Sequence, residues 1–151
     1  MQVFREFDEL SNDEIKLILK SVDEPDKEKG TSLRYGFSII HIQDNEDIGV
    51  VYFAPDNSDR QYLRGHLSYG ISPAYSGHNY AMKACKLLKP IIFMHNFDRV
   101  FVGAKYDNIA SIRTIEKLGA QPITMDDIPD RDIWQALQNE KIAMYMWDIN
   151  Q

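Results

Sequence analysis

Two segments of the sequence combine small, polar and apolar residues in a pattern suited to binding a phosphorylated ligand. The first, ISPAYSGHNYAMKACKLL (Ile71 to Leu88), is typical of a strand, a tight polar loop and a helix start. Such a loop gathers free backbone N–H groups, which bind phosphates. The second, VFVGAKYDNIASIRTIEKLGA (Val100 to Ala120), would place Asn108 and Ser111 at the adjoining strand end, where reacting groups usually lie. Together they indicate an enzyme that holds a phosphorylated carrier and acts beside its far end.

The first half of the chain supplies the elements before this loop. Ser11 and Glu14 have capping-box spacing ahead of an apolar stripe. The stripe follows helical spacing and comprises Ile15, Ile18, Leu19 and Val22. This pattern predicts a helix that ends before the charged loop EPDKEKG. β-branched and aromatic residues then predict strands at 33–42, 48–54 and about 61–71, which form an antiparallel meander across the turns QDNED and PDNSDR.

The second half alternates helices and strands. From Gly77 to about Met94 the apolar spacing is helical, and Pro90 predicts a kink or an early stop. A strand at 99–104 and a helix at 109–118 follow, with Gly119 suited to the C′ position. The stripe of this helix that we expect to be buried comprises Ile109, Ile112, Ile115 and Leu118. A short helix around 131–139 and a strand at 142–149 complete the chain.

This order predicts an α+β (mixed α/β) fold. We expect a mixed sheet of about six to seven strands, with the antiparallel meander first, then a right-handed strand–helix–strand crossover, and with helices on both faces. The sequence contains no internal repeat, low-complexity tract or linker, so it predicts a single domain over residues 1–151.

The composition of the chain limits the kinds of partner that we expect it to bind. The net charge of −6 argues against binding to nucleic acid and mildly favours a cationic or amine-bearing partner, although it also serves simple solubility. The chain starts without a long apolar run and contains no membrane-length apolar segment, so we expect no signal peptide and no membrane association. A lone cysteine, Cys85, lies on an apolar stripe, which predicts a core residue and a reducing, cytoplasmic compartment. We expect no metal site.

The segment from Leu67 to Ala120 resembles the GNAT superfamily of N-acetyltransferases, closest to the branch that acetylates the N-termini of ribosomal proteins. The resemblance rests on LSYGISPAYSGHNYAMKACKLL, followed at the expected distance by NIASIRTIEKLGA. The branch carries an Arg-Gly-x-Gly-Tyr-Ala loop and then Asn-x-x-Ser and Glu-Lys-Leu-Gly. This chain has Ser76 where the family usually has Arg or Gln, and Asn79 where it usually has Gly. Asparagine is the non-glycine residue best able to adopt the left-handed conformation.

The resemblance implies acetyl-coenzyme A as co-substrate and a small-molecule or peptide amine as acceptor. The pyrophosphate would lie on the loop from Ser76 to Ala81, and the pantetheine arm beside the strand that ends at Ile71. An N–H of that strand would polarise the thioester carbonyl. The residues implied in cofactor binding are Tyr69, Gly70, Ile71, Ser76, Gly77, His78, Asn79, Tyr80, Ala81, Asn108 and Ser111.

For catalysis the resemblance implies that Asn108 positions the arm and that Ser111 protonates the departing thiolate. Ile115 occupies the place where many GNAT enzymes carry a tyrosine acid. An ammonium must lose a proton before it attacks, and His66 is the best candidate base by residue type and by period-two alternation with Gly70. Two alternatives stay open: Asn108 also suits an N-cap, and a lone strand histidine also suits a structural role.

Three functions fit the sequence. The first is an N-acetyltransferase in which the amine attacks the thioester directly. The second is a coenzyme A-binding sensor or partner-binding module that has lost catalysis, and the third is the same fold without a nucleotide site. The acceptor stays open, with segments 24–30 and 126–131 expected on its side, and the choice between monomer and homodimer stays open as well.

Overall fold

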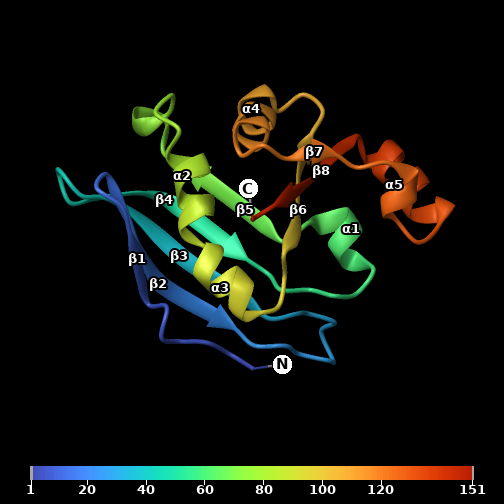
Figure 1. Cartoon of the computed structure of the whole chain (residues 1–151), viewed down its shortest axis with the longest axis horizontal. Helices are drawn as coiled ribbons and strands as arrows, with labels where there is room; N and C mark the ends of the chain where they lie inside the picture. Colours follow the sequence, from blue (N-terminus) through green and yellow to red (C-terminus); the bar gives the residue numbers. More distant parts are fainter. Residues whose placement is uncertain (1, 151) are drawn as a thin grey trace.

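The computed structural model describes residues 2–150, so the two end residues of the predicted 1–151 domain lie outside the described residues. The described chain forms one sheet of eight strands, in the order β1-β2-β3-β4-β5-β6-β8-β7, with five α-helices (Figure 1). The strands are β1 Glu9–Ser11, β2 Ile15–Asp23, β3 Arg34–His41, β4 Glu46–Phe53, β5 Leu67–Ile71, β6 Arg99–Lys105, β7 Gln121–Pro122 and β8 Ile142–Asp148. The helices are α1 Arg60–Arg64, α2 Tyr80–Leu87, α3 Lys89–Met94, α4 Ile109–Lys117 and α5 Arg131–Glu140, with short 3₁₀ turns η1 Pro73–Tyr75 and η2 Met125–Asp127.

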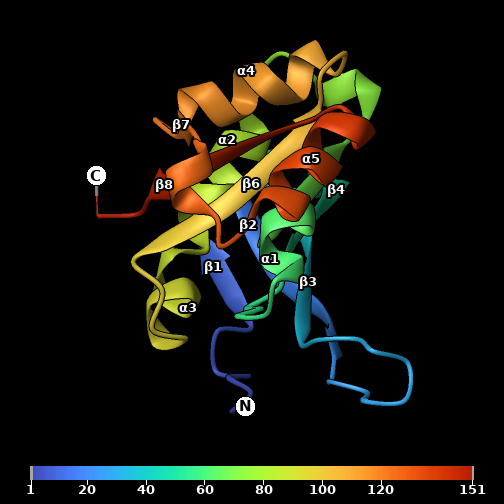
Figure 2. The same cartoon turned by 90° about the vertical axis from the view of Figure 1, so that its right-hand side faces the viewer.

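The predicted fold class is confirmed. β1 to β5 form an antiparallel meander, β5 and β6 are parallel neighbours across the crossover through α2 and α3, and β8 lies antiparallel between β6 and β7. Helices cover both faces of the sheet: α2 and α3 pack on one face with α4 beside them, and α1 and α5 lie on the other (Figure 2). The sheet has more strands than the six to seven predicted, because neither β1 nor β2 was expected.

The predicted helix after Ser11 is wrong: residues 15–23 form β2. Ile15 and Leu17 are both fully buried, which is the alternation of a strand with one face on a core. The apolar residues fit a helical period as well, but pairing with β1 and β3 on both sides decides the conformation. The side chain of Asn12 accepts hydrogen bonds from the backbone N–H groups of Glu14 and Ile15, which is turn chemistry between two strands and not a helix cap.

The third predicted strand begins later than expected. Residues 60–64 form α1, and β5 starts only at Leu67. The turn at Gly65 explains the boundary, since its φ of 72° is a left-handed conformation that ends the helix. A side chain at Gly65 would also lie 3.0 Å from the carbonyl oxygen of Phe101.

The helices of the crossover and the helix after it agree more closely with the prediction from the sequence. α2 ends at Leu87 and α3 begins at Lys89, so the break predicted from Pro90 is confirmed, with the proline in the first turn of α3. Of the buried stripe predicted for α4 and its C-cap, Ile115 and Leu118 are buried and Ile112 is partly buried. The prediction is wrong at Ile109, which is 53% exposed because the first turn projects beyond the core. Gly119 has the expected positive φ, 86°.

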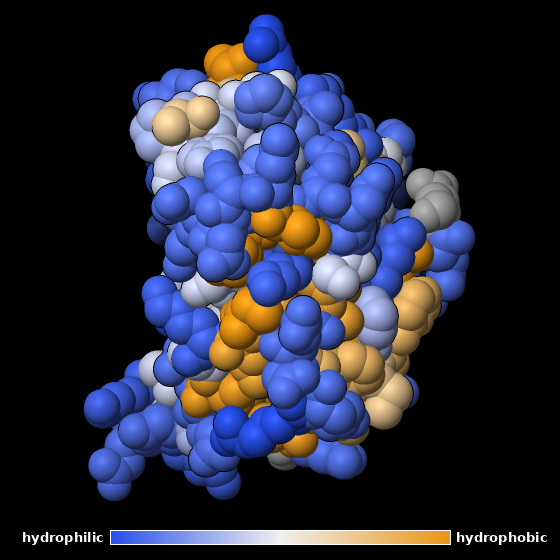
Figure 3. Space-filling view, turned by 90° about the vertical axis from the view of Figure 1, so that its left-hand side faces the viewer, coloured by the Kyte–Doolittle hydropathy of each residue, from blue (hydrophilic) through white to orange (hydrophobic). Residues whose placement is uncertain are grey.

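The main core lies between the sheet and α2, α3 and α4, and a smaller one lies under α1 and α5. Cys85 is fully buried in the main core, as predicted. Viewed from the side of β1 and β2, hydrophobic surface is visible in the middle of a face that is otherwise hydrophilic (Figure 3). Among the described residues, no helix has the length and apolar character needed to cross a membrane.

Because β2 is a strand, truncating two neighbouring side chains in it should lower the stability of the protein by clearly different amounts. Leu17→Ala should lower the free energy of unfolding by about 2–5 kcal/mol, because it empties a fully buried site. Ile18→Ala is the matched control, and it should cost clearly less because Ile18 is only partly buried. Urea unfolding measures both values. A larger loss for Ile18→Ala would contradict the register described here.

Candidate active site

A gap opens in the middle of the sheet between its two parallel strands. β5 and β6 are paired through a single pair of residues, Leu67 and Val102. On its other edge, β5 pairs with β4 along its whole length to Ile71. Beyond Leu67 the parallel strands therefore separate towards their C-terminal ends.

This gap leaves backbone groups of β5 without a strand partner. Peptide groups alternate in direction along an antiparallel pair, and the Ser72 N–H donates to the carbonyl oxygen of Ile48 just beyond the end of β4–β5 pairing. The even-numbered residues of β5 therefore face β4, and the N–H and C=O groups of Tyr69 and Ile71 face the gap. Backbone groups in this position bind a ligand that runs as an extended strand.

A groove of about 490 Å³ lies along this gap and continues to the start of α2. It brings together every residue predicted to bind the cofactor except His78, whose ring lies beside that of Tyr80 at 5.5 Å. The groove is lined by Tyr69, Gly70, Ile71, Tyr75, Ser76, Gly77, Asn79, Tyr80, Ala81, Asn108, Ala110, Ser111, Arg113, Thr114 and Lys117.

The loop before α2 has the backbone conformation of an anion site. Gly77 and Asn79 both have positive φ, 85° and 64°, so the left-handed conformation expected of Asn79 is present. This bend directs the first N–H groups of α2 towards the groove end. Lys117 reaches across from α4 and donates to the side chain of Asn79 at 2.6 Å. Arg113 lines the same wall one helical turn earlier.

Three side chains meet at the other end of the groove. The Tyr69 hydroxyl lies 2.9 Å from Ser111 Oγ and 3.3 Å from the Ser111 carbonyl oxygen. Burial raises the pKa of Tyr69 to about 12, against the opposing effect of the hydrogen bond with Ser111, so the phenol keeps its proton at neutral pH. Asn108 caps α4, because its Oδ1 accepts the Ser111 N–H at 3.2 Å. The capping alternative for Asn108 is thus realised, and its amide still lines the groove.

His66 is not brought together with Asn108 and Ser111. It is 3% exposed, its Nδ1 accepts the Phe101 N–H at 2.8 Å, and its Nε2 therefore donates to the Asp56 carbonyl oxygen at 3.0 Å. Burial lowers its pKa, with the hydrogen bond to Asp56 acting in the other direction. With both ring nitrogens engaged, His66 has no free lone pair to accept a proton from an amine.

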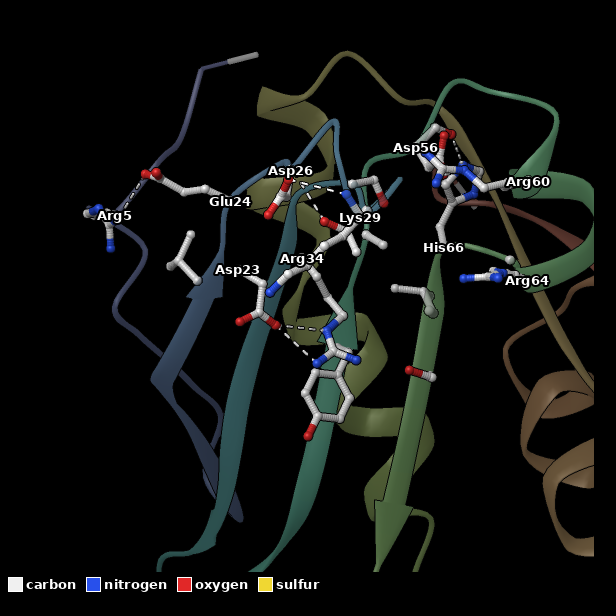
Figure 4. A pocket seen from close by; sticks show the side chains of 18 residues that line it. Arg5, Asp23, Glu24, Asp26, Lys29, Arg34, Asp56, Arg60, Arg64 and His66 are labelled. Atoms are coloured by element: carbon white, nitrogen blue, oxygen red, sulfur yellow. Dashed lines mark hydrogen bonds and ion pairs between the residues drawn. The ribbon is translucent and has the colours of Figure 1, made fainter.

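A second cavity, of about 920 Å³, lies on the opposite face of the sheet (Figure 4). Tyr52 and Ser68 are directly opposed on β4 and β5, and both line this cavity, whereas their neighbours Phe53 and Tyr69 pack towards the main core. The first half of β5 thus borders this cavity and the second half borders the groove. The two spaces approach each other where β5 leaves β6.

Sequence reasoning missed several of these features. Arg113 and Lys117 have i, i+4 spacing on the predicted 109–118 helix, and that spacing was the available signal for a basic wall. The side-chain contact of Tyr69 with Ser111 had no signal, since nothing in the spacing relates a strand to a helix 42 residues later. Of the two segments expected on the acceptor side, 24–30 contributes to the second cavity, while 126–131 lines neither space.

Comparison with known proteins agrees with this geometry. Residues 2–121 match the family model of the acetyltransferase (GNAT) domain. An acetyltransferase of the GNAT family from Bacillus anthracis is 20% identical, with a TM-score of 0.56 over 77% of this chain and 67% of that one. A candidate ribosomal-protein-serine acetyltransferase from Vibrio cholerae is 13% identical, with a TM-score of 0.60 over 93% and 97%. No curated protein matches the chain.

A third solved structure is that of the microcin C7 self-immunity acetyltransferase MccE in complex with acetyl-CoA and AMP. It is 13% identical, with a TM-score of 0.60 over 89% of this chain and 92% of that one. At these identities the likeness concerns the fold. The family model covers well over half of the sequence, so the chain belongs to the GNAT family of acetyltransferases. In general terms its activity is therefore acetyl transfer.

The neutral, buried state of His66 predicts a loss of stability in mild acid. Its folded pKa lies below that of an unfolded histidine, about 6.5, so the unfolded chain binds the extra proton first. The free energy of unfolding should fall as the pH drops from about 7.5 to about 5.5, by at most about 1.4 kcal/mol per pH unit for each such histidine. Partial burial also lowers the pKa of His95, which adds to this decline.

His66→Asn isolates the contribution of His66. Its amide oxygen can accept the Phe101 N–H in place of Nδ1, but the side chain does not titrate. Urea unfolding at several pH values should give a shallower decline for this variant, with the part due to His95 retained. His78→Asn, at an exposed loop position, is the control and should keep the full decline. An unchanged slope in His66→Asn would show that His66 is not the titrating group.

Proposed function

We propose that this protein is an acetyl-coenzyme A-dependent N-acetyltransferase of the branch that acts on ribosomal-protein N-termini and related primary amines. The observation that carries this proposal is the early end of the β5–β6 pairing. Because the pairing ends early, the backbone amides of Tyr69 and Ile71 face a groove, and this groove runs to the loop before α2, whose conformation suits an anion. Membership in the GNAT family, which generally uses acetyl-CoA, supports the choice of donor.

The residues present fit coenzyme A. The left-handed Gly77 and Asn79 shape the loop for the pyrophosphate, and Lys117 and Arg113 supply the positive charge that Ser76 does not. The backbone of β5 would hold the amides of the pantetheine arm as a neighbouring strand would. Loss of the usual Arg or Gln at position 76 is thus offset from α4.

When bound, acetyl-CoA supplies a thioester activated for acyl transfer. The N–H groups of Tyr69 and Ile71 face the gap, where they would donate to the thioester carbonyl oxygen as negative charge develops on it. The Tyr69 hydroxyl lies within hydrogen-bond distance of Ser111 Oγ, and either oxygen can be the donor. In our proposal the phenol donates, so that the Ser111 proton points into the groove, passes to the departing sulfur and is replaced from water. Asn108 fixes Ser111 through its backbone N–H.

The acceptor would enter from the second cavity and meet the donor in the gap. Its nitrogen attacks the carbonyl carbon, so that the C–N bond forms and the C–S bond breaks without a covalent enzyme intermediate. The proton lost by the ammonium passes to water in the open cavity, since both nitrogens of His66 are engaged. His66 therefore has a structural role in this proposal.

A second candidate is a coenzyme A-binding module without catalysis. It is favoured by Ser76 in the place of the family's Arg or Gln, and by the lack of a free lone pair on His66. Calorimetric titration with acetyl-CoA, followed by a thiol-release assay over a panel of amines, separates the two. Binding with release supports the transferase, binding with no release supports the module, and no binding contradicts both.

The role of Ser111 predicts a change in rate rather than in binding. Ser111→Ala should lower kcat by about 10²-fold or more, because the leaving thiolate loses its proton donor, while the Kd for acetyl-CoA changes little. A thiol-release assay at saturating substrate gives kcat, and calorimetric titration gives the Kd for acetyl-CoA. Ser11→Ala, at an exposed position on β1, is the control. An unchanged kcat would remove Ser111 from the mechanism.

For the basic wall of α4, formed by Arg113 and Lys117, we expect an effect on binding rather than on rate. Lys117→Ala should weaken acetyl-CoA binding by about tenfold, since a charge-assisted contact to phosphate is lost, while kcat at saturation stays close to that of the wild type. Lys86→Ala removes an exposed lysine of α2 that does not line the groove, and it should leave Kd unchanged. Equal Kd values for the two variants would place the phosphates elsewhere.

A further inference from the structure

The second cavity has a charge balance opposite to that of the whole protein. The chain carries a net charge of −6, yet the lining of this cavity holds five Lys or Arg side chains and four Asp or Glu side chains (Figure 4). Its one histidine, His66, is buried and neutral. Besides the groove with Arg113 and Lys117, this cavity is therefore a second place in this acidic protein where basic side chains gather around a space large enough for a small molecule.

The acidic members of the lining are almost all neutralised by arginine. Asp23 accepts two N–H bonds from Arg34, whose guanidinium also lies 4.5 Å from the centre of the Tyr52 ring. Asp56 pairs with Arg60 at 3.5 Å.

The remaining carboxylates are also occupied. Glu24 pairs with Arg5 at 3.5 Å. Asp26 has no cationic partner among residues 2–150, but its Oδ1 accepts the backbone N–H groups of Glu28 and Lys29 within its own turn. The cavity thus offers little to a polyamine or another multiply cationic acceptor.

Two cations of the lining remain without an acidic partner. Within the part of the chain that the structure describes, neither the Arg64 guanidinium nor the Lys29 ammonium makes an ion pair or a side-chain hydrogen bond. Arg64 stands in the last turn of α1 and extends towards β5, across the cavity from the loop that carries Lys29 (Figure 4). A guanidinium beside a cavity, with its N–H groups uncommitted, is suited to bind carboxylate or phosphate.

The position of these cations relates them to the acceptor. Arg64 precedes β5 by three residues, and Ser68, on the same strand, lines the same cavity just before the gap. A molecule bound between Arg64 and Lys29 therefore lies on the face of the sheet that carries α1, away from the groove assigned to the donor.

We propose that the acceptor is a primary amine that also carries an anionic group, a carboxylate or a phosphate, and that Arg64 and Lys29 bind this group in the second cavity. The inference rests on the proposed function. It narrows the expectation, drawn from the net charge, of a cationic or amine-bearing partner to an amine that also carries an anion. The anion anchors the acceptor at one side of the cavity and leaves its amine free to reach the gap.

Matched amines test this proposal. β-Alanine is compared with β-alaninamide, and O-phosphoethanolamine with ethanolamine, with spermidine as the cationic alternative. The anionic member of a pair should have a kcat/KM about 10- to 100-fold higher, as expected for a charge-assisted hydrogen bond. The pair with the larger ratio identifies the anion as carboxylate or phosphate. The proposal would be overturned if spermidine, or the neutral amines, had a higher kcat/KM than both anionic amines.

Two variants assign the preference to the cavity. Arg64→Ala should abolish most of the ratio and Lys29→Ala part of it, while the Kd for acetyl-CoA stays unchanged because neither residue lines the groove. Arg99→Ala is the matched control: this arginine is exposed on β6, lies outside both spaces and should keep the ratio. A ratio that survives Arg64→Ala contradicts the proposal.

Binding without turnover separates this inference from the proposed function. O-Phosphoethanolamine and β-alanine are titrated calorimetrically into the protein saturated with coenzyme A. Binding that is lost in Arg64→Ala but retained in Arg99→Ala supports the anion site, even where no amine is acetylated and the transferase proposal fails. If neither probe binds in an Arg64-dependent manner and no anionic amine is preferred, the anion site is wrong, and acetylation of neutral amines would still uphold the transferase.

Discussion

The parallel pairing of β5 and β6 ends after Leu67 and Val102, and the chemistry of the site depends on this early end. A longer ladder would consume the backbone groups of Tyr69 and Ile71. The gap does not close because each strand is held from outside, β5 by five residue pairs with β4 and β6 by seven with β8. Backbone amides without a hydrogen-bond partner cost free energy unless water or a ligand satisfies them. This cost favours the binding of a ligand that runs alongside β5 as an extended strand.

In our proposal, the gap also favours direct transfer between donor and acceptor over a covalent intermediate. The groove and the second cavity lie on opposite faces of one sheet, so donor and acceptor can occupy the protein together and meet edge to edge. The described residues offer no thiol for a relay, since Cys85 is fully buried and burial raises its pKa to about 12. The hydroxyl of Ser111 stands beside the leaving group rather than the acyl carbon in our proposal.

The fold class and most of the groove were predictable from the sequence, because they depend on local signals. Pro90 breaks the crossover helix, Asn79 takes the left-handed turn, and Asn108 and Ser111 keep a fixed spacing on one helix. The errors lie where local signals are ambiguous or silent. The apolar residues from Ile15 to Val22 fit both helical and strand periods, and only pairing with β1 and β3 decides between them. The engagement of both His66 nitrogens depends on Phe101 and Asp56, which no local pattern connects to it.

The short helix α1 has a consequence for how this protein can diverge. It joins β4 to β5 and contains no fully buried residue, but its Leu63 packs against the smaller core and its Tyr62 ring lies 5.3 Å from that of Phe101, so Arg64 is the exposed position that can change without disturbing either core. Its exit at Gly65 is also constrained, by the positive φ of this residue and its close approach to the backbone of Phe101. In our proposal, separate segments of the chain therefore bind the donor and the acceptor. In our proposal, a substitution at Arg64 therefore changes the choice of acceptor while the groove for the donor is kept.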